Sequence, residues 1–347
     1  MTTSNVLFRL DANDQIGTGH LMRCLVIADA LQEFGVTCWF LCYPLPERLQ
    51  QLISDKKHLS LCPTDIDNEF SLIVQLQPDW IVVDHYALDA EWERKARPLA
   101  SHILVLDDLA DRPHVADLLL DQGPLRTPAD YANMINPECR LLLGCRYALL
   151  RKEYKQLQRT SCQTWQKGLI CFGGADPAHA TLSTVKSLDK IQDAHQFSWT
   201  VVAGAANSDW PSLQQWQAET SLNVTLLYHH GDMATLMSEH DFSIGAAGGM
   251  TWERCCIGLP SIVIPIAENQ KFNDDVLAHF QLCERLTLSD LSIPEKLATA
   301  LQDLKINADK YFYRGQAFID GNGVPRLIEY ILKGNKPEQQ ELTDENC

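Results

Sequence analysis

The sequence has little that would place the protein on a membrane or a nucleic acid. No apolar run approaches the roughly 18 residues that a membrane-spanning helix requires, and no basic start followed by an apolar segment indicates a signal peptide. Basic residues are scarce, with 29 Lys and Arg against 45 Asp and Glu and a formal net charge of −16. This balance disfavours polyanionic partners. We therefore expect a soluble, cytoplasmic protein that binds neither nucleic acid nor membrane.

The sequence also lacks the signatures of several enzyme classes. It contains no CxxC pair, no GxSxG elbow, no zinc or calcium motif and no P-loop. The stretch GTGHLM at residues 17–22 lacks the third glycine of a dinucleotide-binding fingerprint. The 12 cysteines are scattered, which predicts buried thiols in a reducing compartment. We expect no metal and no cofactor.

What the sequence does contain is a regular alternation of apolar strand-like runs with amphipathic segments of helical length. The near-continuous apolar character of these runs predicts strands that are covered on both faces. The alternation indicates an α/β protein with two doubly wound, Rossmann-like parallel sheets. The predicted strands are VLFRLD, VTCWFLC, DWIVVDH, HILVLDD and DLLLDQ in the first half, and GLICFGG, FSWTVVAG, NVTLLYH, DFSIGAA and SIVIPIA in the second.

The length of 347 residues favours two domains. A polar stretch without strand pattern, LLRKEYKQLQRTSCQTWQK, predicts a junction near residues 150–166. We predict an N-terminal domain over residues 1–155, a C-terminal domain over residues 166–335 and a disordered tail over residues 336–347. Ligands of open α/β sheets bind outside the carboxyl ends of the strands, and the glycines of this sequence fall there.

A histidine follows the first predicted strand. Gly17 and Gly19 allow a tight turn, and His20 then falls at the N-terminus of a helix. The helix dipole disfavours the imidazolium form there, so a neutral His20 could act as a base. The alternative is that His20 only satisfies a backbone group at the turn.

Two further clusters of polar residues follow strands of the first half. The stretch VVDHYALD places Asp84, His85 and Tyr86 after a strand, where they could line a pocket or simply cap and cover the turn. The stretch VLDDLADRPH offers four residues of metal-ligating type, but without a known spacing solvated turn carboxylates are the better interpretation. These four residues are Asp107, Asp108, Asp111 and His114.

Glycine turns also follow strands in the second half. FGGADP contains Gly173 and Gly174, and GAAGGMTWE contains Gly248 and Gly249. Such turns can offer backbone N–H groups to a phosphate, although a tight connection is the simpler explanation for any one of them. Glu253, one turn into the following helix, would suit the diol of a ribose.

Two more polar groups of the second half have simple alternatives. The next strand end carries Glu268, Asn269 and Gln270, whose polar groups could bind a sugar or cap a helix. The pair of histidines in HHGDM, at residues 229–233, is interpreted as a surface feature.

The motifs FRLDANDQIGTGHLMRC, VVDHYALDAEWE, VLDDLADRPH, GGADP and GAAGGMTWERCCIGLPSIVIPIAENQ, in this order, resemble a known family. They are similar to the UDP-sugar hydrolases of bacterial pseudaminic acid biosynthesis, over roughly residues 5–335. The resemblance implies a GT-B-like architecture with an interdomain cleft. It also implies hydrolysis of UDP-2,4-diacetamido-2,4,6-trideoxy-β-L-altropyranose, a step toward a nonulosonic acid used in surface glycans and flagellin glycosylation.

The same resemblance implies roles for individual residues. His20 matches the catalytic histidine, Tyr86 an active-site tyrosine and Asn269 an asparagine near the substrate. Glu253 matches the ribose-binding position. Met250 departs from related loops, which often carry a hydroxyl residue there. The remaining residues assigned to substrate binding are Gly17, Gly19, Arg23, Gly173, Gly174, Gly248, Gly249, Thr251, Glu268 and Gln270.

The resemblance also suggests a mechanism and leaves rivals. A neutral His20 would take a proton from water as the water attacks the anomeric carbon, with inversion and without a metal. A GT-B glycosyltransferase would share the UDP site but need an acceptor pocket. A nucleotide-sugar binding module would lack the base, and a pyrophosphatase would cleave a P–O bond. The oligomeric state is not readable from the sequence.

Overall fold

The computed structural model describes residues 4–12, 18–161 and 164–333, which form two compact units. The first unit comprises the described residues of Met1–Arg151 and Asn322–Cys347, and the second comprises those of Lys152–Gly321. Within the described ranges, no helix combines the length and hydropathy that crossing a bilayer requires.

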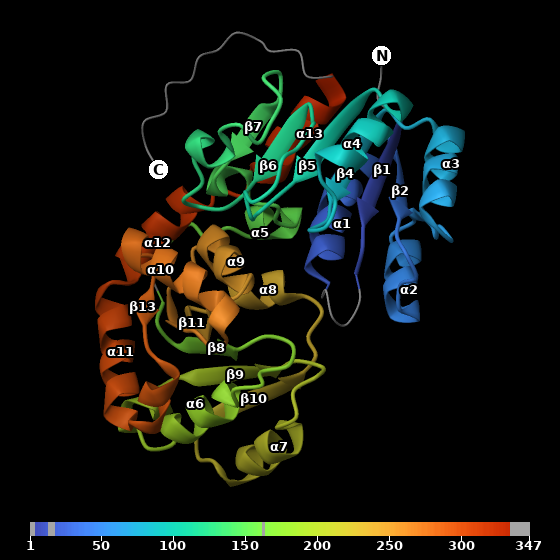
Figure 1. Cartoon of the computed structure of the whole chain (residues 1–347). Helices are drawn as coiled ribbons and strands as arrows, with labels where there is room; N and C mark the ends of the chain where they lie inside the picture. Colours follow the sequence, from blue (N-terminus) through green and yellow to red (C-terminus); the bar gives the residue numbers. More distant parts are fainter. Residues whose placement is uncertain (1–3, 13–17, 162–163, 334–347) are drawn as a thin grey trace. The chain divides into compact units, whose positions relative to one another are not determined.

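A parallel sheet of seven strands organises the first unit, in the order β3-β2-β1-β4-β5-β6-β7 (Figure 1). The strands are β1 (Asn5–Leu10), β2 (Thr37–Leu41), β3 (Leu59–Leu61), β4 (Trp80–Asp84), β5 (His102–Leu106), β6 (Leu118–Asp121) and β7 (Arg140–Leu143). The helices are α1 (Gly19–Gln32), α2 (Glu47–Asp55), α3 (Ile66–Leu76), α4 (Ala90–Ala96) and α13 (Gly323–Lys333).

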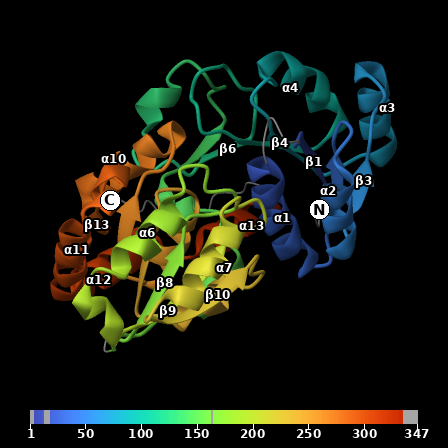
Figure 2. The ribbon, with the colours of Figure 1, turned by 90° about the horizontal axis from the view of Figure 1, so that it is seen from below.

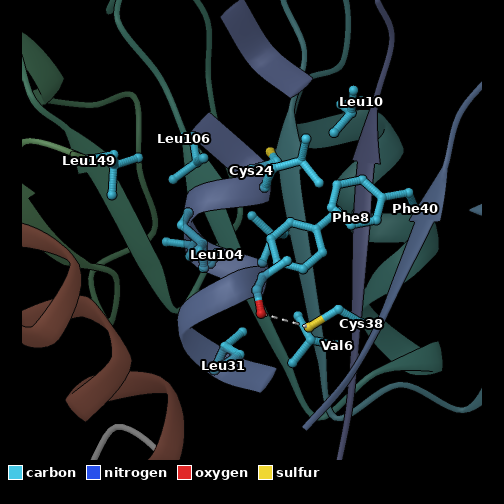
Figure 3. Packing of buried hydrophobic residues seen from close by; sticks show 14 of the residues in the cluster. Val6, Phe8, Leu10, Cys24, Leu31, Cys38, Phe40, Leu104, Leu106 and Leu149 are labelled. Atoms are coloured by element: carbon cyan, nitrogen blue, oxygen red, sulfur yellow. Dashed lines mark hydrogen bonds between the residues drawn. The ribbon is translucent and has the colours of Figure 1, made fainter. Parts of the chain in front are cut away.

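The strands of this sheet are apolar on both faces because each face packs on helices. Phe8 of β1 belongs to a core shared with α1 and α13, whereas the preceding residue, Leu7, belongs to a second core with α3 and α4. Phe8 stacks on Phe40 of the neighbouring strand, with ring centroids 5.0 Å apart (Figure 3). Alternate residues of one strand therefore serve two cores.

The second unit is built on a six-stranded parallel sheet in the order β10-β9-β8-β11-β12-β13. The strands are β8 (Lys167–Cys171), β9 (Ser198–Ala203), β10 (Asn223–Tyr228), β11 (Phe242–Ala246), β12 (Ser261–Ile264) and β13 (Glu284–Arg285). The helices are α5 (Lys152–Gln156), α6 (Ala180–Leu188), α7 (Trp210–Glu219), α8 (Met233–Ser238), α9 (Met250–Ile257), α10 (Lys271–Phe280), α11 (Pro294–Ile306) and α12 (Ala308–Phe318). Helix α7 lies against β10 in both views (Figures 1 and 2).

Each of the ten predicted apolar runs contains a strand, and the prediction of two doubly wound parallel sheets is confirmed. The structure adds β3, β7 and β13. Their segments are short, from two to four residues, and offer too little pattern to be told from loops.

The last helix differs from the predicted domain division, which placed residues 166–335 in one C-terminal domain. Helix α13 packs in the first unit, where Leu327 and Ile331 are fully buried and the indole of Trp80 donates to the Ile331 carbonyl at 3.1 Å. An amphipathic stripe shows that a helix needs an apolar partner but does not say which one. The predicted tail over residues 336–347 lies outside the described residues.

Candidate active site

The order of the first sheet brings two distant polar residues together. Strands β1 and β4 are neighbours, and the chain continues from them toward opposite edges of the sheet, which makes their carboxyl ends a topological switch point. His20 lies in the first turn of α1, after β1, and Asp84 is the last residue of β4. They are 64 residues apart in sequence, and their side chains are hydrogen-bonded.

The bond joins Nδ1 of His20 to Oδ1 of Asp84, and both side chains are buried. Because a carboxylate accepts, Nδ1 carries the proton of the neutral ring and Nε2 carries the lone pair. Among the described residues, no hydrogen bond engages Nε2. An imidazole held in this way can accept a proton at Nε2, and the carboxylate then stabilises the resulting charge.

Arg23, one turn after His20, supports this pair. Its Nε donates to Oδ2 of Asp84 at 2.6 Å, its Nη2 to Oδ1 at 2.5 Å, and its Nη1 to Oδ2 of Asp108 at 3.0 Å. All three nitrogens of Arg23 thus bond to carboxylates of the protein. The structure therefore shows Arg23 as a support for Asp84, and its predicted contact with substrate stays a prediction.

These contacts fix the ionisation of Asp84. Burial by itself would raise the pKa of the Asp84 carboxyl, but the charge of Arg23 and the hydrogen bonds from Arg23 and His20 outweigh it and lower the pKa to about 2. Burial likewise opposes the charge of Arg23, and Asp84 and Asp108 raise the Arg23 pKa in spite of it. Asp84 is therefore ionised at neutral pH and can accept the proton on Nδ1 of His20.

Tyr86 lies against the histidine. Its ring meets the His20 ring edge to face, with centroids 4.5 Å apart and planes at 77°. Its hydroxyl donates to Oδ2 of Asp108 at 3.4 Å, and the side chain is about half exposed. Burial and the Asp108 charge raise the pKa of Tyr86, so its hydroxyl stays protonated at neutral pH. Tyr86, which the resemblance implies as an active-site tyrosine, thus lies next to His20.

The turn after β5 differs from the solvated cluster predicted there. Asp107 is buried and accepts from the Tyr131 hydroxyl and the Ala110 N–H, both at 2.9 Å. His114 pairs with Glu93 at 2.7 Å. In the described part of the chain, no three His, Cys, Asp or Glu side chains are grouped closely enough to hold a metal ion.

Two glycines of the first unit were also predicted to bind substrate. A side-chain carbon on Gly19 would meet no described atom within 4 Å, and Gly17 lies outside the described residues.

In the second unit, β8 and β11 form the corresponding switch point, and the loop from β11 to α9 offers free donors. Among the described residues, the N–H groups of Gly248, Gly249 and Met250 have no hydrogen-bond acceptor, and α9 has no side-chain cap. A side-chain carbon on Gly249 would meet no described atom within 4 Å. Exposed N–H groups at the positive end of a helix suit an anion such as a phosphate.

The other glycine turn, after β8, is engaged with the protein itself. Gly173 has a φ of +100°, which favours glycine. A side-chain carbon on Gly204 would lie 2.3 Å from the Gly174 carbonyl, so this loop packs closely on the next one. Asp176 caps α6 by accepting from the N–H groups of Ala180 and Thr181 at 3.0 and 2.7 Å. The two glycine turns of the sequence therefore differ, because the N-terminus of α6 is occupied and that of α9 is open.

Residues on α9 have two different placements. Thr251 is buried, its hydroxyl donates to the Ala246 carbonyl at 3.3 Å, and its N–H donates to the Gly248 carbonyl at 3.0 Å. Both donors of Thr251 thus serve the loop, although sequence reasoning assigned this residue to substrate. Glu253 and Met250 are half-buried in the first turn.

The loop after β12 is tied to the loop after β11. Gln270 accepts from the Ile266 N–H at 3.0 Å, and Asn273 donates to the Ala247 carbonyl at 2.9 Å. Glu268 and Asn269 are exposed, and no side chain caps α10. Of the three polar residues predicted here, Gln270 shapes the loop, and the other two present their groups to solvent.

Sequence reasoning missed the partnership of His20 with Asp84 and the role of Asp108. The signal for Asp84 was an ionisable residue at the end of a fully apolar strand, DWIVVD, where burial of a charge requires a partner. No sequence spacing could identify that partner, because it depends on β1 and β4 being neighbours.

Comparisons with known proteins bear on both units. Residues 169–340 match the family model described as the glycosyltransferase family 28 C-terminal domain. A UDP-2,4-diacetamido-2,4,6-trideoxy-β-L-altropyranose hydrolase of Campylobacter jejuni is 28% identical over 269 residues, which cover 77% of this chain and 93% of that protein. The spore coat polysaccharide biosynthesis protein SpsG of Bacillus subtilis is 22% identical over 335 residues, or 92% of this chain and 96% of that protein.

Among solved structures, MurG of Acinetobacter baumannii has a TM-score of 0.64 at 16% identity, covering 95% of this chain and 99% of that one. A glycosyltransferase of kitacinnamycin has a TM-score of 0.61 at 14% identity, covering 96% and 100%. These likenesses show the fold, two Rossmann-like domains of the GT-B class. The chain therefore has a GT-B fold, its residues 169–340 are similar to the C-terminal domain of glycosyltransferase family 28, and its predicted resemblance to the UDP-diacetamido-trideoxy-altropyranose hydrolases is confirmed.

Proposed function

We propose that this protein is a UDP-sugar hydrolase that converts UDP-2,4-diacetamido-2,4,6-trideoxy-β-L-altropyranose to UDP and the free sugar. The observation that carries the proposal is the His20–Asp84 pair at the switch point of the first sheet. A histidine oriented by an ionised carboxylate is the equipment of a general base. A module that only binds nucleotide sugars would not need it. The named Campylobacter jejuni relative supports the choice of substrate.

The second unit would bind the UDP part. The free N–H groups of Gly248, Gly249 and Met250 can donate hydrogen bonds to the diphosphate, and Glu253 in the first turn of α9 can accept hydrogen bonds from the ribose hydroxyls. Related loops often carry a hydroxyl residue at the position of Met250. Backbone N–H groups can bind the diphosphate without that hydroxyl. The exposed amide of Asn269 would contact the substrate from the neighbouring loop.

The chemical step follows from the first unit. Nε2 of His20 takes a proton from a water molecule as that water attacks the anomeric carbon. The bond from this carbon to the phosphate oxygen breaks, its electron pair leaves with UDP, and the sugar is released with inverted configuration. Asp84 stabilises the imidazolium, and the edge contact of Tyr86 restricts the ring. UDP is a stable anion, so the step requires neither a strong general acid nor a metal, and N–H donors can receive the growing charge.

In the cell, the free sugar would serve pseudaminic acid synthesis and through it surface glycan and flagellin glycosylation. The rival interpretation of the same fold is a glycosyltransferase, because residues 169–340 match the C-terminal domain of glycosyltransferase family 28. A hydrolase transfers the sugar to water, whereas a glycosyltransferase requires a different acceptor molecule.

The deciding experiment is turnover of the UDP-linked sugar in ¹⁸O-labelled water with EDTA present, followed by mass spectrometry of both products. We expect label in the free sugar and none in UDP, and His20→Asn supplies the matched inactive control. Label in the nucleotide would mean attack at phosphorus and a pyrophosphatase. An absence of turnover by the wild-type protein would contradict hydrolysis and favour a transferase or a binding protein.

A further inference from the structure

Arg254 of α9 is a buried guanidinium without a carboxylate partner. Its exposed fraction is 3%, and no ion pair to it occurs among the described residues. Its Nη2 donates to the Ala246 carbonyl at 2.7 Å and to the Thr251 hydroxyl at 3.1 Å, whereas its Nε has no partner in the described part of the chain. In the first unit, the buried Arg9 and the partly buried Arg23 are each paired with two acidic residues.

The residues around Arg254 leave space for its guanidinium. A side-chain carbon on Gly245 would lie 2.4 Å from Nη1 of Arg254, so β11 admits the guanidinium because residue 245 is glycine. The thiols of Cys171 and Cys283 are neighbours, and burial raises the pKa of both, so they are neutral at pH 7. The carboxylate of Glu253, the preceding residue, acts on Arg254 only electrostatically. The guanidinium of Arg254 is therefore held in the fold next to the β11–α9 loop.

An unpaired buried cation is unfavourable unless an opposite charge reaches it. Burial lowers the pKa of Arg254, yet an arginine side chain stays protonated at neutral pH. Its two acceptors, Ala246 and Thr251, flank the loop whose N–H groups are free. The positive end of the α9 dipole lies at the same place, so two positive features reinforce each other where the loop is open.

We infer that Arg254 is a positioning residue whose charge is balanced by the diphosphate of the bound nucleotide sugar. It does not touch the ligand. It holds the ends of the β11–α9 loop through Ala246 and Thr251 and adds a positive potential beneath the free N–H groups. This inference rests on the proposed function, and specifically on a UDP site at the N-terminus of α9.

The test compares UDP with uridine, which lacks the diphosphate, by calorimetry on the wild-type protein and on Arg254→Met and Arg254→Lys. We expect Arg254→Met to bind UDP about tenfold or more weakly and uridine within about twofold of wild type, since only the anion senses the charge. Its melting temperature without ligand should not fall below the wild-type value, because an unpaired buried charge has been removed. Arg254→Lys keeps the charge and should retain the ratio of the two affinities within about threefold.

Four results would overturn the inference. Equal losses of UDP and uridine affinity in Arg254→Met would mean a merely structural role, and unchanged UDP affinity would mean no role. If Arg254→Met does not fold, Arg254→Lys still tests the inference. Loss of the wild-type ratio of UDP affinity to uridine affinity in Arg254→Lys would show that the positive charge is not what favours UDP. Failure of the wild-type protein to bind UDP would overturn the proposed function as well, which separates the two cases.

Discussion

The carboxyl ends of the two sheets carry sites of opposite construction, although both sheets share one parallel, doubly wound plan. In the first unit, ionisable side chains meet: His20, Asp84, Arg23 and Asp108 form a continuous hydrogen-bonded set. In the second unit, backbone N–H groups of the β11–α9 glycine loop have no acceptor among the described residues, and the buried cation of Arg254 lies next to this loop. The first construction can move a proton and the second can hold an anion, so variants in the two units should fail differently.

The largest effect is expected from His20→Asn. Loss of a general base lowers kcat by about 10²–10⁴-fold, whereas UDP affinity should stay within about twofold because the diphosphate site is in the second unit. Steady-state kinetics with the UDP-linked sugar and calorimetry with UDP measure the two quantities. The exposed His195 provides the control His195→Asn, which should retain full activity. A kcat for His20→Asn within threefold of wild type would remove His20 from catalysis.

Acid unfolding tests the charged set of the first unit. The pKa of Asp84 is about 2, below its ordinary 3.8, so its carboxylate stabilises the fold above pH 3.8, and this contribution is lost as the pH falls toward 2. The difference corresponds to about 2 kcal/mol of unfolding free energy at neutral pH. Urea unfolding between pH 5 and pH 2 should therefore show a shallower pH dependence in Asp84→Asn than in wild type.

The control for this experiment is Asp111→Asn, which changes an exposed carboxylate of the same unit. It should follow the wild-type profile. Parallel profiles for wild type and Asp84→Asn would show that the contacts to Arg23 and His20 do not lower the Asp84 pKa.

Gly249→Ala probes the backbone site of the second unit. The added methyl group meets no described atom within 4 Å, so stability should change by less than about 1 kcal/mol, but it occupies the space through which a phosphate would approach. We expect UDP affinity to fall about tenfold with little change in the melting temperature. Gly231→Ala is a matched control, since that position also has no described atom within 4 Å. Equal UDP affinities for both variants would argue against phosphate binding at this loop.

The smallest effect is expected from Glu253→Ala. Loss of a carboxylate that accepts ribose hydroxyls should weaken UDP about fivefold and change kcat less than that. The exposed Glu219 of α7 gives the control Glu219→Ala. Comparison with 2′-deoxy-UDP sharpens the result, because Glu253→Ala should abolish the preference for the ribose hydroxyl. An unchanged UDP affinity would remove Glu253 from this role.

Prediction from the sequence was accurate where a local pattern dictates the structure. The runs DWIVVDH and DFSIGAA became buried strands, and the residues after them became loops at the carboxyl edge of each sheet. It was inaccurate where the outcome depends on a distant partner. The bonds of Arg23 to Asp84 and Asp108 were not foreseen, and Asp107 was expected in solvent but is buried against Tyr131.

The amino-acid sequence by itself determined the two parallel sheets, the glycine turns at their edges and the histidine at the start of α1, because hydrophobic periodicity and glycine act within a few residues of each other. Only the tertiary structure decided that Asp84 faces His20, that α13 returns to the first unit, and that the N-terminus of α9 stays open while Asp176 closes that of α6. These outcomes depend on which strands become neighbours and on which charges are buried together. These long-range contacts depend on how the whole unit packs, and no residue spacing in the sequence predicts them.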